Sequence, residues 1–328
     1  MTATILVNTP AKTGSIRPLN PLRDLPSIAD LIELCFSSTL DSDGRSYIEQ
    51  MRRSGRDSIF LNWAPRVMET VSLPLSGFVW ENNGKVVGNV SLIPFSSRGK
   101  KIYLIANVAT HPDFRRMGIA RQLTIAAMEK AREKKASAIW LHVRDDNPGA
   151  IKLYEELGFA ERSKRTSWEA AQDIPPLDLA NRNIKITSRE TRDWPVHRVW
   201  LSRSYPPSID WYYSQTWELF KPGILNFIYR LMLEVNTYQW AGHRGESLKA
   251  VLACQRTGRG DQLWLSVSPD PDQELVTALL KYGRRYLNPS RSLQLDFPAS
   301  SLDDAIRAAG LTAQRTLVWM EAPGIATF

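Results

Sequence analysis

The chain has 328 residues, of which 43% are hydrophobic and 23% are charged. This composition is ordinary for globular proteins and excludes wholesale disorder, and the length predicts about two domains. No apolar run approaches the ~20 residues that span a bilayer, and the first residues lack the pattern of a secretory signal. The two cysteines and four histidines do not cluster, so a disulfide scaffold and a metal site are not expected. We therefore expect a cytoplasmic protein without membrane contact.

The charge balance is basic, with 42 Lys and Arg against 34 Asp and Glu, which gives a formal charge of +8. A polyanion or a small phosphorylated ligand would account for such an excess. A solvated basic surface accounts for it equally well. No signature of a nucleic-acid-binding module supports the first possibility, so we do not expect nucleic acid as a partner.

Alternating and helical patterns predict mixed α/β structure. Residues 1–14 read as a tail and 15–20 as a short strand. Asn82-Asn83-Gly84 lies between two β-rich runs and predicts a hairpin, and Gly158 is placed to end a helix. The other elements expected in the first half are a helix from Asp24 to Phe36, helices at 44–53 and 58–70, a strand at 101–112, a helix at 118–135, a strand at 137–143, a helix at 148–157 and a strand at 159–170.

The second half repeats the first at low identity. After a Pro-Pro segment at 171–182, which we interpret as a linker, the order of strands, turns and helices starts again. The segment SIRPLNPLRDLP, for example, lines up with NIKITSRETRDWP. Repeated order and spacing indicate an internal duplication.

The two copies differ between the middle strand and the last helix. Val108 and Gly158 lie 50 positions apart, whereas Val267 and Gly310 lie 43 apart. The segment missing from the second copy corresponds to DFRRMGIA of the first copy. Chemistry is therefore expected in the first copy.

A strand leads into that segment and a helix follows it directly. Gly118 and Ala120 lack bulk, so the backbone can approach a ligand and expose successive N–H groups at a helix start, where anions are favoured. Arg115, Arg116 and Arg121 add positive charge. The pattern predicts a pyrophosphate cradle, but it is neither a P-loop nor a dinucleotide-binding fingerprint.

Two motifs identify what the first half resembles. The chain reads Arg115-x-x-Gly118-x-Ala120 and then Asn147-x-x-Ala150-x-x-x-Tyr154-x-x-x-Gly158-Phe159. This combination resembles the GCN5-related N-acetyltransferase (GNAT) superfamily over about residues 15–170. The resemblance implies an α/β (α+β) fold of two GNAT-like domains, each a mixed, largely antiparallel sheet flanked by helices.

The resemblance implies acetyl transfer from acetyl-CoA to an amine by direct attack in a ternary complex. Tyr154 would be the general acid that protonates the leaving thiolate. The acceptor, a small molecule or a protein, is left open. The residues implied in cofactor binding are Val108, Ala109 and Thr110 along the strand, Arg115, Arg116, Met117, Gly118, Ile119, Ala120 and Arg121 in the loop and helix start, and Asn147 and Ala150 in the second motif.

The general base is left open, because the strand IYLIANVAT carries no carboxylate. His111, Asp145, Asp146 and Glu81 are the nearby candidates, and a water chain or a base on the substrate remains possible. The missing carboxylate also keeps an alternative function open, a non-catalytic CoA-binding sensor or scaffold.

The resemblance divides the chain into a tail at 1–14, a GNAT domain at 15–170, a linker at 171–182 and a second GNAT-like domain at 183–328. In the second copy, Ala299 and Ile306 stand at the positions of Asn147 and Tyr154. The second domain is therefore interpreted as a degenerate copy without a cofactor site. Its aromatic residues at 211–217 are expected to form core or to line an acceptor pocket.

Overall fold

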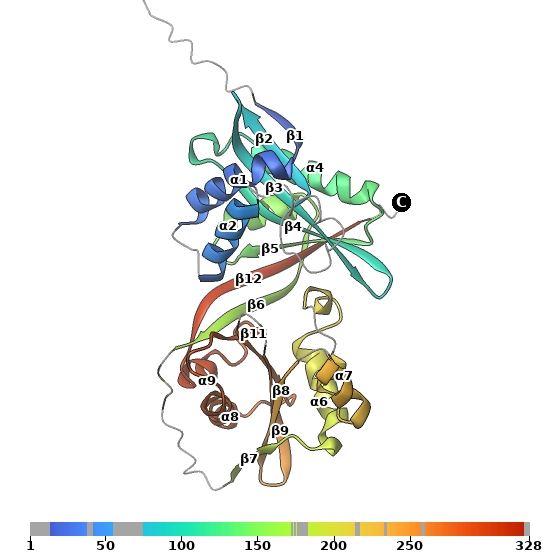
Figure 1. The fold of residues 1–328 in the computed structure, drawn as a ribbon, viewed down its shortest axis with the longest axis vertical. Helices are drawn as coiled ribbons and strands as arrows, with labels where there is room; N and C mark the ends of the chain where they lie inside the picture. Colours follow the sequence, from blue (N-terminus) through green and yellow to red (C-terminus); the bar gives the residue numbers. More distant parts are fainter. Residues whose placement is uncertain are drawn as a thin grey trace, which may run out of the picture. The chain divides into compact units, whose positions relative to one another are not determined.

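The computed structural model describes residues 14–37, 42–54, 75–171, 173, 175, 183–213, 217–232, 235–256 and 260–324 (Figure 1). The expected helix at 58–70 and most of the expected tail and linker lie outside these residues. Contacts divide the chain into two compact units. The first comprises residues 1–142, 149–160 and 320–328, and the second comprises 143–148 and 161–319. None of the described helices is both long and apolar enough to cross a membrane.

The sheet of the first unit is mixed and mostly antiparallel. The Asn83-Gly84 turn joins its second and third strands with positive φ at both residues, as the sequence predicts for a hairpin. Strands β4 and β5 pair in parallel. In spatial order the strands are β1 (Ser15–Pro18), β2 (Gly77–Asn82), β3 (Lys85–Ser97), β4 (Lys100–Thr110), β5 (Ala138–Arg144) and the end of β12 (Leu311–Pro323).

Helices cover both faces of this sheet (Figure 1). On one face, α1 (Pro21–Phe36) and α2 (Ser42–Ser54) share a core with Val79. On the other face lies α4 (Ile119–Glu133), so close that a Cβ added to Gly88 would come within 2.8 Å of the Ile119 side chain. The alternation of side chains along β2 and β3 therefore places α4 opposite α1 and α2.

The first helix begins earlier than the sequence predicts. Pro21 occupies its first turn, and Pro26 lies inside it rather than at its start. The buried Asp24 does not open the helix; its carboxylate accepts a hydrogen bond from the Asn20 amide at 2.8 Å and pairs with Arg17 at 2.6 Å. The ion pair ties the helix to β1, which sequence periodicity alone does not reveal.

The second unit repeats the order of elements of the first. The described pairings of its sheet are also mostly antiparallel, and β10 pairs with β11 in parallel. The strands run β7 (Ile184–Ser188), β8 (Thr237–Arg244), β9 (Ser247–Arg256), β10 (Asp261–Val267), β11 (Leu293–Pro298), β6 (Ala160–Ala170) and β12, and the helices are α6 (Trp194–Ser204), α7 (Ile224–Met232), α8 (Gln273–Tyr286) and α9 (Asp303–Ala308).

Each unit includes a strand from the other half of the sequence. Residues 161–170 of β6 belong to the second unit, and the end of β12 from Met320 belongs to the first. In the first unit, a Cβ on Gly324 would lie 2.1 Å from the carbonyl oxygen of Ala136, so the chain end packs closely there. The residue ranges of the compact units thus differ from the domain ranges 15–170 and 183–328 that the sequence predicts.

Most of the described aromatic residues at 211–217 pack into core, whereas Tyr212 is exposed. Tyr213 and Trp217 both contact Trp264, with ring centroids 5.2 Å apart, and Trp217 also contacts Tyr205. Trp211 is buried as well. Of the two readings of this cluster, the structure favours packing.

A buried ion pair fixes β6 in the second unit. The Arg165 side chain is 1% exposed, and its Nε pairs with the Asp296 carboxylate on β11. Its Nη1 donates to the Ser204 carbonyl at 2.8 Å, and the Tyr213 hydroxyl donates to the Asp296 carboxylate at 3.0 Å. The free-energy cost of burying these two charges is offset because nearly every polar atom of the pair has a hydrogen-bond partner.

We expect Asp296→Ala to lower the free energy of unfolding by about 3–5 kcal/mol, because it leaves the Arg165 charge buried without its partner. Arg165→Met combined with Asp296→Ala should recover part of this loss. Urea unfolding measures both, with the exposed Arg162→Met on the same strand as the control. Equal losses in the single and double variants would contradict the pairing.

Candidate functional site

Strand β4 continues past its last partner on β5. The parallel pairing joins Ile102–Ile105 with Ala138–Leu141, and no further pair follows in the described residues. On its other side, β4 stays paired with β3 as far as Thr110. Backbone groups of Ala106–Thr110 that face away from β3 can therefore pair with an extended ligand, as at any open strand edge. The predicted residues Val108, Ala109 and Thr110 lie on this segment.

A bulge occurs where β4 leaves β5. The β3–β4 register shifts between Asn89 and Ser91, and Asn107 has a φ of +52°. Asn89 is fully buried and its Nδ2 donates to the Asn107 carbonyl at 2.9 Å. The Asn107 Nδ2 in turn donates to the Tyr47 hydroxyl at 3.0 Å and to Ser91 Oγ at 3.2 Å.

Sequence reasoning missed this network. Its available signal was the pair of asparagines inside β-rich runs, since Asn is uncommon in strands and tolerates positive φ. Together the four side chains hold the backbone at the point where β4 becomes accessible.

The loop after β4 turns the chain into a helix start without a side-chain cap. Arg116 and Gly118 have φ values of +63° and +76°, and the first bond of α4 runs from the Gln122 amide to the Gly118 carbonyl at 3.0 Å. The amides of Ile119, Ala120 and Arg121 precede that bond and have no intrahelical acceptor. Gly118, at the N-cap position, has no side chain that could accept a hydrogen bond from these amides. This arrangement favours an anion at the helix start.

The three arginines of the loop have different surroundings. Arg115 and Arg116 are exposed, and Arg115 Nε donates to the Thr110 carbonyl at 3.4 Å. Arg121 pairs with Glu156 on α5 (Pro148–Glu156), so it links two helices of the unit. Two arginines, rather than three, are left to face an anion at the start of α4.

Tyr154 lies on α5 and is 6% exposed. Its ring meets Phe159 edge to face at 6.1 Å, just past Gly158, whose φ of +89° ends the helix. Burial raises the pKa of Tyr154 above its ordinary value. Its hydroxyl therefore stays protonated at neutral pH and can donate a proton or a hydrogen bond.

The remaining predicted residues lie as follows. Met117 is exposed beside Gly118, and the Ile119 side chain is buried, so only its amide can meet a ligand. Ala150 is half-buried on α5. Asn147 precedes α5, is exposed, and donates its amide to the Arg144 carbonyl at 3.1 Å; by its contacts it belongs to the second unit.

The carboxylates considered as general bases are each held by a cation. Glu81 contacts Arg17 at 2.7 Å and Arg23 at 2.8 Å, and these hydrogen bonds lower its pKa. In the second unit, Asp145 pairs with Lys164 at 3.0 Å, and Asp146 with Arg144 at 2.8 Å. The hydrogen bond from Arg144 also lowers the pKa of Asp146, so Glu81 and Asp146 are weakened as bases.

His111, the fourth candidate, lies at the end of β4. Its Nδ1 accepts a hydrogen bond from the Asp113 amide at 3.3 Å. This contact fixes the ring within its own turn, and the geometry does not single it out as a base.

The equivalent helix start of the second unit is closed. Helix α8 is capped by Asp272, whose carboxylate accepts a hydrogen bond from the Leu275 amide at 3.0 Å. Arg244 contacts Asp272 at 2.7 Å and Glu274 at 3.0 Å. The loop before α8 spans 268–272, whereas the loop before α4 spans 111–118, so only part of the length difference between the copies falls here. Ile306, at the position of Tyr154, is fully buried.

Comparison with known proteins supports the resemblance of the first unit to the GNAT superfamily. Residues 30–159 match the model of the Acetyltransferase (GNAT) family. Over 67 residues the chain is 36% identical to the [ribosomal protein bS18]-alanine N-acetyltransferase of Escherichia coli, which covers 20% of this chain and 45% of that protein. It is 38% identical to an acetyltransferase of Pectobacterium atrosepticum over 25% of this chain and 55% of that one. The chain thus spans about half the length of these relatives.

Solved structures resemble nearly the whole chain in fold. A GCN5-related N-acetyltransferase from Sphaerobacter thermophilus has a TM-score of 0.58 at 16% identity, covering 96% of this chain and 97% of that one. A tandem GNAT protein from the clavulanic acid biosynthesis pathway has a TM-score of 0.50 at 15% identity, covering 96% and 100%. At this identity the likeness concerns the fold alone, and it confirms the expected pair of GNAT-like domains.

Proposed function

We propose that this chain, a member of the GNAT superfamily with its family domain at residues 30–159, transfers an acetyl group from acetyl-CoA to an amine in the cytoplasm. The observation that carries the proposal is the uncapped start of α4, where three successive amides lack an acceptor next to Arg115 and Arg116. These groups suit the pyrophosphate of CoA. The open edge of β4 suits the amides of its pantetheine arm.

The reaction proceeds by direct attack in a ternary complex. Acetyl-CoA supplies the thioester, whose C–S bond breaks as the amine nitrogen bonds to the carbonyl carbon. Tyr154 donates its hydroxyl proton to the sulfur that leaves. Because Glu81, Asp145 and Asp146 are ion-paired, water or the substrate itself takes the proton from the amine. Holding both reactants together supplies much of the rate enhancement.

The acceptor is an amine on a protein or a small molecule. One relative acts, by its name, on an alanine of a ribosomal protein. Release of free CoA thiol, measured across short peptides with free N-termini, polyamines and aminoglycosides, tests the activity. CoA binding without thiol release from any amine would favour a non-catalytic sensor or scaffold instead.

Gly118→Asp is expected to abolish CoA binding, because a carboxylate would repel the pyrophosphate at the helix start. Gly99→Asp is the matched control, since Gly99 has a φ of +75° against +76° for Gly118 and both have open space around them. Calorimetry on folded protein measures the affinity. Wild-type affinity in Gly118→Asp would exclude this loop as the phosphate site.

Tyr154→Phe is expected to lower kcat by about 10-fold or more with little change in acetyl-CoA affinity, because the hydroxyl acts only on the leaving group. Tyr103→Phe, which removes the hydroxyl of a half-buried tyrosine on β4, should leave kcat unchanged. If kcat were also unchanged in Tyr154→Phe, another group would be the acid.

We expect one CoA per chain despite the two GNAT-like domains, because the equivalent helix start of the second unit is capped by a carboxylate. The Asp272 carboxylate occupies the start of α8 and would repel a pyrophosphate. Native mass spectrometry with saturating acetyl-CoA gives the stoichiometry. Two molecules bound per chain would overturn this assignment of the second domain.

A further inference from the structure

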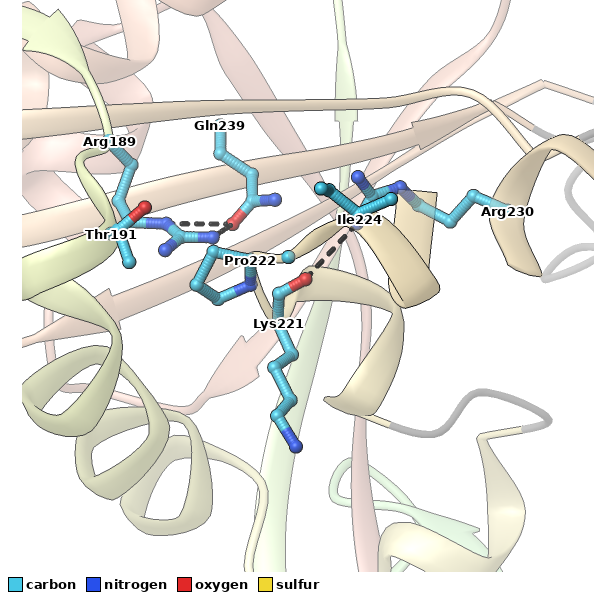
Figure 2. A pocket seen from close by; sticks show the side chains of 8 residues that line it. Arg189, Thr191, Lys221, Pro222, Ile224, Arg230 and Gln239 are labelled. Atoms are coloured by element: carbon cyan, nitrogen blue, oxygen red, sulfur yellow. Dashed lines mark hydrogen bonds between the residues drawn. The ribbon is translucent and has the colours of Figure 1, made fainter. Parts of the chain in front are cut away.

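The second unit contains a cavity of about 440 Å³ that the proposed acetyl transfer does not use (Figure 2). Its distinguishing feature is charge, since three of its lining residues are cations and none is a carboxylate. The lining residues are Arg189, Thr191, Lys221, Pro222, Gly223, Ile224, Arg230 and Gln239.

Arg189 is held rigidly by neutral partners. Its Nε and Nη2 donate to Gln239 Oε1 at 3.1 and 2.8 Å, and its Nη1 donates to the Glu190 carbonyl at 3.2 Å. The guanidinium also lies over the Trp194 ring at 5.6 Å. Burial lowers the pKa of Arg189, and the charge of Arg230 lowers it further, so the two cations lie close enough to repel each other.

One carboxylate, Asp193, offsets only part of the charge of the two arginines. Asp193 raises the pKa of Arg189 electrostatically and so offsets part of its charge, and its carboxylate also accepts a hydrogen bond from the Glu190 amide at 2.8 Å. Arg230 donates its Nη1 to the carbonyls of Leu219 and Lys221 at 2.9 and 3.3 Å, and both acceptors are uncharged. The positive charge of the two arginines therefore lacks a full counter-charge from the protein.

Lys221 adds a third charge at the cavity wall. Its Nζ lies 3.3 Å from Glu218, and both side chains are about half exposed, so this pair is weak and easily exchanged for a ligand. The wall also includes the Thr191 side chain and the start of α7 at Ile224. Cations, a hydroxyl and the first turn of a helix together are groups that bind phosphate.

The cavity is apolar on one side. Pro222 and Ile224 line it, and Ile224 is 79% exposed. Helix α7 continues from there with further exposed apolar side chains, namely Leu225, Ile228, Leu231 and Met232. An apolar substituent on a bound anion would cover part of this surface.

We propose that this cavity binds a phosphate monoester that carries an apolar group. A dianionic phosphate carries more negative charge than a carboxylate to set against the excess of cations at this wall, and guanidinium groups bind its oxygens. A soluble phosphorylated metabolite and a lipid with a phosphate headgroup share this chemistry. The cavity shares no lining residue with the proposed CoA site.

The test is calorimetric titration of the full chain with hexyl phosphate, inorganic phosphate and heptanoate, and co-sedimentation with phosphatidylcholine vesicles that contain phosphatidic acid. Each titration and the co-sedimentation are repeated with the Gly118→Asp variant, in which the proposed CoA site is removed. Arg230→Gln and Lys221→Gln test the cavity, and Arg285→Gln, an exposed arginine of the same unit, is the control.

We expect hexyl phosphate to bind more tightly than inorganic phosphate or heptanoate, and to bind unchanged in Gly118→Asp and Arg285→Gln. Arg230→Gln should weaken binding by about 10-fold or more, since it removes a charged donor, and Lys221→Gln should weaken it less. Vesicle binding that depends on Arg230 and Lys221, without binding of hexyl phosphate, would assign the site to a lipid headgroup. Equal affinity in Lys221→Gln, Arg230→Gln and Arg285→Gln, or no binding of either form, would overturn the proposal.

Discussion

The site of the first unit depends on one backbone constraint, which is that β4 stops pairing with β5 before it ends. The bulge at Asn107 is held by the fully buried Asn89, whose side chain replaces a partner that the regular ladder would have supplied. Beyond it, the strand keeps an open edge, and the left-handed residues Arg116 and Gly118 aim the next amides at the same end of the sheet. Backbone groups without a protein partner cost little free energy at the surface, because water can bond to them. A ligand can take the place of that water.

The two copies show how the same order of elements gives different surfaces. Helix α4 begins after a glycine and leaves its first amides open, whereas α8 begins after Asp272, which caps its own helix. A carboxylate at a helix start stabilises the helix by about 1 kcal/mol and repels anions. The Asp272 cap at α8 thus favours helix stability over a site for an anion. The second unit instead gathers its cations at Arg189 and Arg230, on different elements.

The role of each charged residue in this protein therefore depends on its local contacts. The formal charge of +8 suggests a general affinity for polyanions. The structure divides part of that charge among distinct uses: Arg165 is buried with Asp296, Arg121 joins two helices, and Arg189 lines a cavity. The lining of that cavity has three cations and no carboxylate, which is why the cavity, rather than the net charge, motivates the proposed phosphate ligand.

The sequence by itself determined the order of elements, the duplication and the two motifs, because these depend on local periodicity, on glycines at positive φ and on spacing along the chain. It also placed Gly118 and Gly158 at the helix ends they occupy. Only the tertiary structure decided that Asp24 binds Arg17 instead of opening a helix, and that Asn89 holds the bulge. It also decided that most of β6 belongs to the second unit and the end of β12 to the first. Each of these depends on pairing between residues far apart in the chain. The partner of a polar side chain is set by the fold and not by its neighbours in sequence.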